Sequence, residues 1–480
     1  MRLQVAVFYN GFALALTGLF MLVSAGVGVV YHDGSAGLLT VSGLLIAGIG
    51  YFPMIFIPRR TDVRLRESIF VVAFGWLTCT FAGAIPFYLY GPPFSFVNSI
   101  FESISGFTTT GASILATVED LPKGLLFWRA CTEWLGGIGI VSFALAVMPR
   151  MGQVSRPLFQ QEYTGLVVPP ANVRATDILR GLFAVYLGLT LTQTVLLAVT
   201  GMPLYDAATT ALATLPTGGF SVRNASLAYY NSVAVDVITM VFMFLGGMNF
   251  VYLHVLLTQP RKARQGLEVA ALYYGLILAV VALVVFLIRG SVYTNWGDAL
   301  RLGSFQVISV ATTTGFGTAD SSVWPIPAQI AIVMILLIGA CNGSTGGGIK
   351  HDRILLFFKL LHYRFRQMVH PSALASIRVD GRYVDLDAVE RTVFYIAPYL
   401  ATLGLATLIL SCIGMNAVDS FTGTAACLAN AGPGMGSLGT MENYSAIPTA
   451  AKVILSFVML FGRLEMFALV LPFTPGFWRK

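Results

Sequence analysis

The sequence predicts an all-α membrane protein that crosses the bilayer many times. Of its 480 residues, 56% are hydrophobic and only 11% are charged, whereas soluble domains carry about 25% charged residues. Apolar runs long enough to cross the hydrocarbon core, which takes roughly 20 residues of helix, recur along the whole chain. These runs lack the period-2 alternation of barrel strands, and only helices or closed barrels satisfy every backbone group in lipid. The spans are therefore expected to be helices.

The apolar runs predict ten spans. They lie near residues 5–30, 36–57, 68–90, 124–148, 177–201, 231–257, 269–289, 326–360, 389–413 and 446–471. With the N-terminus on the inner side, 22 of the 29 Lys and Arg residues fall in the inner segments. Because inner loops carry the excess of basic residues, we expect both termini in the cytoplasm.

After the first two spans, the chain repeats one pattern four times. Each outer connection ends in a Thr/Gly-rich run, and a fixed internal pattern of this kind indicates a repeat architecture. The runs are Phe107–Ala112, Leu215–Phe220, Ala311–Phe316 and Leu428–Pro433, with aligned glycines at Gly111, Gly219, Gly315 and Gly432. The predicted division is an N-terminal hairpin followed by four pore repeats, at 1–67, 68–176, 177–268, 269–388 and 389–480.

A polar residue precedes each run at a similar distance. Asn98, Asp206 and Asp419 lie 13 residues before their glycine, and Asp298 lies 17 residues before Gly315. Such residues accept hydrogen bonds from the free N–H groups that begin a helix, so we expect them to cap four short re-entrant helices. The extra spacing in the third repeat corresponds to about one helical turn.

The four runs together predict a cation pore with pseudo-fourfold symmetry. Non-helical backbone at membrane depth survives only inside protein or beside a wet cavity, so the four segments should converge on one axis. Carbonyl oxygens there can replace the water shell of a potassium ion, and the helix C-termini favour cations. The predicted filter residues are Thr109, Thr110, Gly111, Thr217, Gly218, Gly219, Thr313, Thr314, Gly315, Asn430, Ala431 and Gly432. The alternative reading of any single run is a small-residue contact that eases helix packing.

Two features of the inner half of the membrane are unusual. The span that begins at Ile326 is interrupted by residues 339–349, with too few apolar residues on either side to cross alone. Arg463 lies inside the last span, where an ionisable residue is a functional candidate by default. Its alternative reading is an arginine that reaches the inner interface or pairs with a carboxylate of another span. Glu133 is a further buried-charge candidate, for which only helix pairing is suggested.

The Thr/Gly runs, the broken span and the repeat layout resemble the Trk/Ktr/HKT superfamily of potassium transporters. The resemblance covers the whole chain, and it implies gated uptake of potassium across the bacterial cytoplasmic membrane. It implies that Gly111 favours potassium, because serine there marks a sodium-preferring subgroup. It also implies a gating loop below the filter and a pore barrier at Arg463. The gating-loop residues would be Gly339, Asn342, Gly343, Ser344, Thr345, Gly346, Gly347 and Gly348.

The same resemblance implies certain partners. It implies a homodimer, with one pore in each protomer, and a cytosolic nucleotide-binding ring as the regulatory subunit. Membrane lipids surround the chain, potassium at the filter is the only expected metal ion, and neither a cofactor nor nucleic acid is expected.

The alternative function is a secondary transporter for another small cation, sodium or ammonium, that uses broken helices as coordinating sites. An intramembrane enzyme would need a paired carboxylate set, a zinc motif or a nucleophile elbow, and the sequence contains none of these. The five cysteines show no CxxC pairing and are expected to be packing residues.

Overall fold

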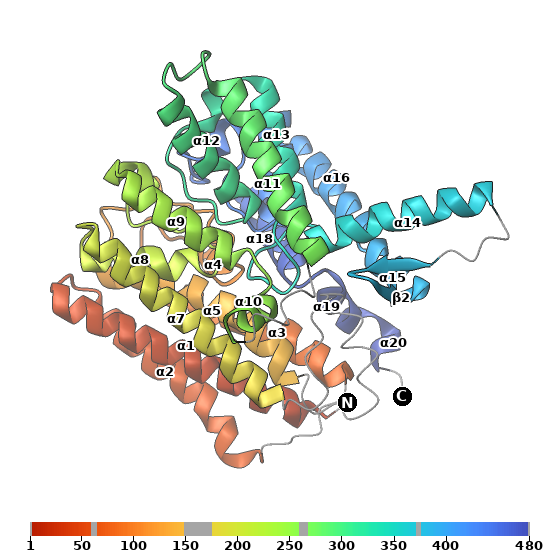
Figure 1. Ribbon diagram of the computed structural model, residues 1–480. Helices are drawn as coiled ribbons and strands as arrows, with labels where there is room; N and C mark the ends of the chain where they lie inside the picture. The colour runs from red at the N-terminus through yellow and green to blue at the C-terminus, as the bar shows by residue number, and fades with distance from the viewer. Residues whose placement is uncertain (1, 59–64, 148–174, 259–266, 371–375, 479–480) are drawn as a thin grey trace.

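The structure, a computed structural model, describes residues 2–58, 65–147, 175–258, 267–370 and 376–478. It is a bundle of helices (Figure 1). Within these described ranges, six helices are long and apolar enough to cross a membrane, and one sharply bent pair provides a seventh such span if it is counted as one. Among the described residues, the strands are a single antiparallel hairpin, β1 (Ile377–Val379) and β2 (Arg382–Val384). The predicted all-α membrane class is confirmed.

Two N-terminal helices, α1 (Leu3–Tyr31) and α2 (Ala36–Phe56), form a tight hairpin along one side of the molecule (Figure 1). Glycines at seven-residue spacing let the two backbones approach closely. A Cβ added to Gly18 would lie 2.6 Å from the carbonyl oxygen of Gly43, and one added to Gly11 would lie 2.6 Å from that of Gly50. Asp33 in the connecting turn accepts a hydrogen bond from the Gly124 N–H at 2.7 Å. This bond anchors the hairpin to the start of α5 (Lys123–Val147).

Four units of helix, short helix and helix follow the hairpin. The first contains α3 (Leu65–Tyr90), α4 (Phe96–Phe107) and α5 (Lys123–Val147); the second α7 (Ala175–Val199), α8 (Leu204–Thr214), η2 (Ser226–Tyr230), α9 (Val233–Gly246) and α10 (Phe250–Thr258). The third contains α11 (Leu267–Ile288), α12 (Trp296–Ala311), η4 (Ser321–Val323), α13 (Ile326–Ile338) and α14 (His351–Val369). The last contains α15 (Leu386–Phe394), α16 (Ile396–Cys412), α17 (Ala417–Leu428), η5 (Gly436–Leu438), α18 (Thr449–Arg463), α19 (Phe467–Val470), η6 (Leu471–Phe473) and α20 (Pro475–Trp478).

The short helices α4, α8, α12 and α17 begin three residues earlier than the predicted caps require. Ser95, Asn295 and Asn416 are the capping residues, and their side chains accept backbone N–H groups of the first turn. Pro203 precedes α8 and provides no side-chain cap. The cap prediction is therefore wrong by one turn: the predicted residues are each the third residue of their helix, namely Asn98, Asp206, Asp298 and Asp419.

The extra turn predicted for the third repeat is present, because α12 has 16 residues whereas α4 and α17 have 12 each. The carboxylates in the first turns of α8, α12 and α17 lie where the positive end of the helix dipole favours negative charge.

Breaks interrupt the second long helix of three units. The interruption predicted in the third unit is present, between α13 and α14. The spans predicted as continuous at 231–257 and 446–471 are wrong: α9 and α10 meet at 104°, and α18 ends before Glu465 and Met466, which have φ of 51° and 52°. A tertiary hydrogen bond stabilises the break between α9 and α10, since Asn249 donates from Nδ2 to the carbonyl oxygen of Asn342 at 2.8 Å.

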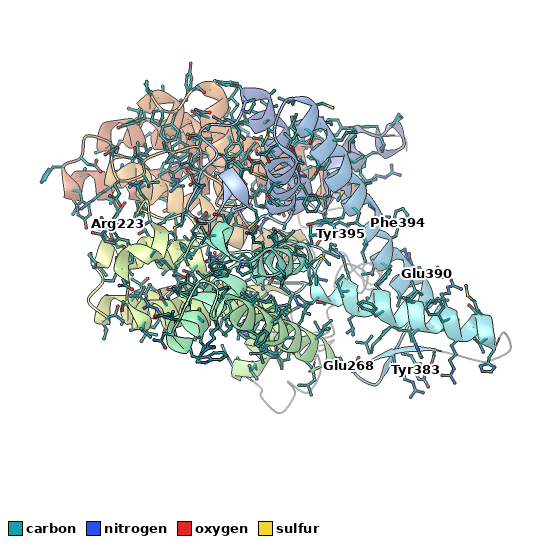
Figure 2. All side chains as sticks on the ribbon, turned by 90° about the horizontal axis from the view of Figure 1, so that it is seen from above. Arg223, Glu268, Tyr383, Glu390, Phe394 and Tyr395 are labelled. Carbon is teal, nitrogen blue, oxygen red and sulfur yellow. The ribbon has the colours of Figure 1, made fainter. Side chains whose placement is uncertain are left out.

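Helix α14 continues beyond the body of the molecule and carries the β-hairpin and α15 beside it (Figures 1 and 2). Leu356, Ile377, Val379 and Val389 form a small buried cluster between these elements. Lys359 pairs with Glu268, and Arg364 pairs with Glu390. The extension is thus fixed to α11 and α15 by ion pairs as well as by its own small core.

Candidate ion pore

Four backbone segments of equivalent structure follow the four short helices. We call them the filter loops: Thr109–Gly111, Thr217–Gly219, Thr313–Gly315 and Asn430–Gly432. In each, the N–H before the glycine donates to a carbonyl five residues earlier; the four bonds are Thr110 to Ser105 at 2.8 Å, Gly218 to Ala213 at 2.9 Å, Thr314 to Ser309 at 2.8 Å and Ala431 to Ala426 at 2.9 Å. The repeated bond shows that the sequence alignment of the four runs is also a structural one.

Left-handed backbone recurs at every second residue of these loops. The glycines have φ of 76°, 87°, 88° and 80° for Gly111, Gly219, Gly315 and Gly432. Two residues earlier, φ is 52°, 58°, 57° and 53° for Thr109, Thr217, Thr313 and Asn430. Left-handed backbone is uncommon outside glycine and costs energy in a β-branched residue such as Thr. Alternation of handedness turns successive carbonyl oxygens toward the same side of the chain, as a lining of carbonyl ligands requires.

The four filter loops close into a ring. A Cβ added to Gly111 would collide with the carbonyl oxygen of Gly218 in the next loop. The other three glycines are equally close to a neighbouring loop. An added Cβ would collide with the carbonyl oxygen of Thr314 at Gly219, of Ala431 at Gly315 and of Thr110 at Gly432. Because the last contact returns to the first loop, the four loops surround one axis, and no side chain larger than hydrogen fits at the four glycines.

The side chains of the filter loops have different partners in different repeats. Thr217 lies 3.3 Å from Thr345, Oγ1 to Oγ1, and Thr313 accepts the N–H of Gly347 at 3.0 Å, so two of the predicted filter residues contact the interrupted segment 339–349. Asn430 donates to Thr110 Oγ1 at 3.0 Å. All these side chains are fully buried.

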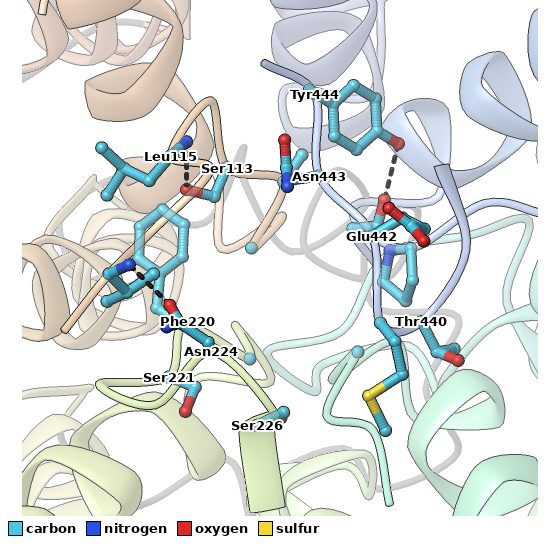
Figure 3. Close-up of a pocket in the computed structure, with 18 of the residues that line it drawn as sticks. Ser113, Leu115, Phe220, Ser221, Asn224, Ser226, Thr440, Glu442, Asn443 and Tyr444 are labelled. Atoms are coloured by element: carbon cyan, nitrogen blue, oxygen red, sulfur yellow. Dashed lines mark hydrogen bonds between the residues drawn. The ribbon is translucent and has the colours of Figure 1, made fainter. Parts of the chain in front are cut away.

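A cavity of about 160 Å³ opens above the ring. The four filter glycines form part of its lining, and Glu442 adds a carboxylate at its edge. Figure 3 shows Tyr444 and Glu442 from the fourth repeat around the same cavity as Ser113 and Phe220. The Tyr444 hydroxyl donates to the carbonyl oxygen of Gly432 at 2.7 Å, which fixes the fourth filter loop from outside.

The interrupted segment of the third repeat, residues 339–349, lies against the filter loops on the side opposite this cavity. We call it the intramembrane loop. Thr345 Oγ1 donates to the carbonyl oxygens of Leu215 at 2.9 Å and Gly246 at 3.2 Å. A Cβ on Gly347 would collide with the carbonyl oxygen of Ala429. The loop therefore contacts the C-terminal ends of the short helices in the second and fourth repeats.

The remaining residues predicted for this loop hold its shape. Gly339, Gly343 and Gly348 have φ of 71°, 72° and 84°, in the left-handed region that favours glycine. The carbonyl oxygen of Gly343 accepts the Phe250 N–H at 3.0 Å. Ser344 Oγ donates to the Cys341 carbonyl at 2.6 Å and accepts the Gly346 N–H at 3.2 Å. The break in α9 and α10 and the break in α13 and α14 thus support each other.

Arg463 is buried, with 5% of its surface exposed, and its guanidinium binds two carbonyl oxygens. Nη1 donates to Thr345 in the intramembrane loop, and Nη2 donates to Gly136 in α5 at 3.0 Å. Glu465 pairs instead with Lys350 at 3.2 Å and Arg353 at 2.6 Å, at the end of the same loop. Arg463 therefore neither reaches an interface nor pairs with a carboxylate among the described residues; it ties the last repeat to the loop.

Behind the filter, sequence reasoning singled out Glu133 but missed the two charged residues beside it. Glu102, Arg129 and Glu133 are buried between the first and second filter loops. Arg129 and Glu133 are four residues apart in an apolar span, hence on one face of α5, and this spacing was the available signal. Helix pairing, the only role suggested for Glu133, is wrong, because its carboxylate accepts the backbone N–H of Phe220.

These features define a class: a helical, polytopic membrane protein in which four re-entrant loops surround a common axis. Residues 54–480 match the TrkH family model, described as a cation transport protein. The chain is 32% identical to the Trk system potassium uptake protein TrkH of Vibrio parahaemolyticus over 98% of each chain, and 31% identical to that of Escherichia coli K12 over 96% of each. The crystal structure of the potassium transporter TrkH from Vibrio parahaemolyticus superimposes with a TM-score of 0.88, at 30% identity and with all of both chains covered. The chain belongs to the TrkH family of cation transport proteins.

Proposed function

We propose that this chain takes up potassium through the ring of filter loops. The observation that carries the proposal is the cyclic contact of each filter glycine with the carbonyl of the next loop. Such a ring presents backbone oxygens to a dehydrated cation from four sides. The names of its relatives, potassium uptake proteins, support potassium as the ion.

In this proposal, potassium binds the twelve residues of the filter loops, from Thr109–Gly111 through Asn430–Gly432. The intramembrane loop is the gate, because its contacts with Thr217 and Thr313 lie directly at the filter. Arg463 acts as the pore barrier and holds this gate closed. The chain divides into the hairpin 1–67 and pore repeats 68–176, 177–268, 269–388 and 389–480, and the caps are reassigned as described above.

The proposal also assigns surroundings. The chain lies in the bacterial cytoplasmic membrane with both termini inside, as the distribution of its basic residues indicates. It works as a homodimer under a cytosolic nucleotide-binding subunit. The Trk system names of its relatives support association with a further Trk component.

The test is growth of a bacterial strain that lacks its own potassium uptake systems. The wild-type chain, supplied with a cytosolic Trk regulator, should restore growth at low potassium, and Gly111→Ser should abolish rescue or admit sodium. Gly91→Ser is the matched control, because Gly91 also has positive φ, 89°, but has no atom within 4 Å of its added Cβ. If wild type fails to rescue and conducts no rubidium in liposomes, the potassium proposal is wrong and another cation takes its place.

A further inference from the structure

Three charged side chains lie directly behind the filter, at the junction of the first two repeats. Glu102 is on α4, and Arg129 and Glu133 are on α5. Their exposed fractions are 0%, 3% and 0%. Charged side chains are almost never fully buried unless they are paired, since removal from water is costly. The hydrogen bonds that these side chains make therefore show which parts of the filter they hold in place.

Glu102 holds the segment that leaves the first filter loop. Its Oε1 accepts the hydroxyl of Ser113 at 2.9 Å, and its Oε2 accepts the backbone N–H of Ile114 at 2.9 Å. These residues follow Gly111 by two and three positions. Oε1 also accepts Arg129 Nε at 2.5 Å. The carboxylate thus joins the first loop to α5.

Arg129 and Glu133 hold the second filter loop from the same helix. Arg129 Nη1 donates to the carbonyl oxygen of Ser221 at 3.0 Å, and its guanidinium carbon lies 3.6 Å from the ring centroid of Phe220. The Glu133 carboxylate accepts the N–H of Phe220 at 3.0 Å and 3.2 Å. A Cβ on Gly218 would meet both Glu133 oxygens at 2.6 Å, so this carboxylate lies against the filter backbone itself.

The contacts that join the other neighbouring loops, in the part of the chain that the structure describes, are neutral. Gly317 N–H donates to Ser226 Oγ at 3.2 Å, Thr440 Oγ1 donates to the Ala319 carbonyl at 3.0 Å, and Tyr444 N–H donates to the Ser113 carbonyl at 2.8 Å. The positions equivalent to Glu102, nine residues before each filter glycine, are Thr210, Gln306 and Gly423. Among these contacts beside the filter loops, charged side chains therefore mark the junction of the first and second loops.

We propose that Glu102, Arg129 and Glu133 are positioning residues that set the ion selectivity of the filter. This inference rests on the proposed potassium function. The triad fixes the spacing of the first and second loops, and selectivity in a carbonyl-lined site depends on the number and arrangement of its dipoles. The triad lies in a poorly screened interior, where its polar groups act strongly on a cation nearby.

The direct test is Glu133→Gln in the purified full-length chain. Glutamine keeps an oxygen that accepts the Phe220 N–H and replaces the other carboxyl oxygen with an amide donor, so the change alters the polarity beside Gly218 and leaves the shape nearly intact. Because a bound ion raises the melting temperature, potassium-dependent thermal shifts report the apparent Kd without relying on the gate. We expect the apparent Kd for potassium to rise about tenfold, the effect of a modest loss of electrostatic attraction. Rubidium uptake into liposomes should also lose its preference over sodium.

Asp236→Asn is the matched control. Asp236 is as buried as the triad, with 1% exposed, and it accepts Arg301 Nε at 2.6 Å without touching a filter loop. This variant should lower the melting temperature and leave its potassium dependence unchanged. A merely structural role for the triad predicts the same outcome for Glu133→Gln.

Arg129→Lys provides a second variant if Glu133→Gln cannot be purified. Lysine keeps the charge but lacks the planar fork that reaches Glu102 and Ser221 together. We expect weakened preference for rubidium over sodium. If the variant that can be purified binds potassium as tightly as wild type and shows the same ion preference, the inference is wrong. Absence of any potassium-dependent shift or rubidium uptake in wild type would instead overturn the proposed function.

Discussion

The guanidinium of Arg463 donates a hydrogen bond to the carbonyl oxygen of Thr345, 118 residues away in the sequence. This bond joins the end of α18 to the middle of the intramembrane loop. Because Arg463 also binds the Gly136 carbonyl, it fixes the loop to the helix that follows the first filter loop. Arg463 is therefore one of the side chains that hold the loop in its resting position.

Arg463→Gln should raise resting rubidium flux. A hydrogen bond from a charged donor contributes about 1.5–3 kcal/mol, so its loss shifts a two-state gate toward the open form by roughly tenfold or more. Liposome flux without any regulatory partner measures this directly. Arg391→Gln, on α15 outside the pore, is the control and should leave flux unchanged. Unchanged or lower flux in Arg463→Gln would show that the arginine does not hold the gate.

Glu465→Gln should release the other end of the same loop. Its carboxylate pairs with both Lys350 and Arg353, so either Glu465→Gln or Arg353→Gln breaks the Glu465–Arg353 contact. Residues that share a contact are non-additive, and the double variant should leak no more than the stronger single variant. Flux from the four proteins of this cycle gives the coupling. Glu390→Gln, which breaks the Arg364 pair on the extension, should have no effect on flux. Additive effects of Glu465→Gln and Arg353→Gln on flux would show that the two residues do not act through a common contact.

Asn430→Thr and Asn430→Asp should separate two roles of the fourth filter loop. Threonine occupies the equivalent left-handed position in the other three loops, so Asn430→Thr should retain rescue at low potassium. It should lower thermal stability, because Asn430 Nδ2 donates to Thr110 and to the Met459 carbonyl. Aspartate removes both donors and buries a charge, so Asn430→Asp should abolish rescue. Equal growth of the two variants would contradict this prediction.

Gly18→Leu should destabilise the N-terminal hairpin. The new side chain would overlap the backbone of α2 around Gly43 and Ala47, and overpacking typically costs about 1–3 kcal/mol. The melting temperature of the detergent-purified chain should fall. Gly26→Leu on the same helix is the control, because its added Cβ has no atom within 4 Å. Similar melting temperatures for both variants would mean that the close α1–α2 contact contributes little.

The repeat alignment could be predicted because its signals are local. Each Thr/Gly run carries its own backbone requirement, and the run in the third repeat lies after a helix that is longer by one turn, as the spacing of Asp298 indicated. The interruption at 339–349 was visible for the same reason, since five glycines in eleven residues cannot continue an apolar helix.

The missed features depend on contacts between distant residues. The break between α9 and α10 is stabilised by a contact between Asn249 and Asn342, which are 93 residues apart. Arg129 contacts Glu102, which is 27 residues away in the sequence, and Glu133 contacts Phe220, which is 87 residues away. The prediction of the helix caps was wrong for a simpler reason. Acidic side chains are favoured both at the cap and within the first turn of a helix, and the sequence distance to the filter glycine does not distinguish these two positions.

The contact between Asn430 and Thr110 also constrains how the protein is made. These two residues are 320 positions apart, yet the first filter loop rests on the fourth. Contacts between such distant residues form late, because the intervening chain must first be ordered. During synthesis, the first repeat enters the membrane with its filter loop unsupported on that side until the last repeat has left the ribosome. A newly inserted, incomplete chain therefore has no finished filter.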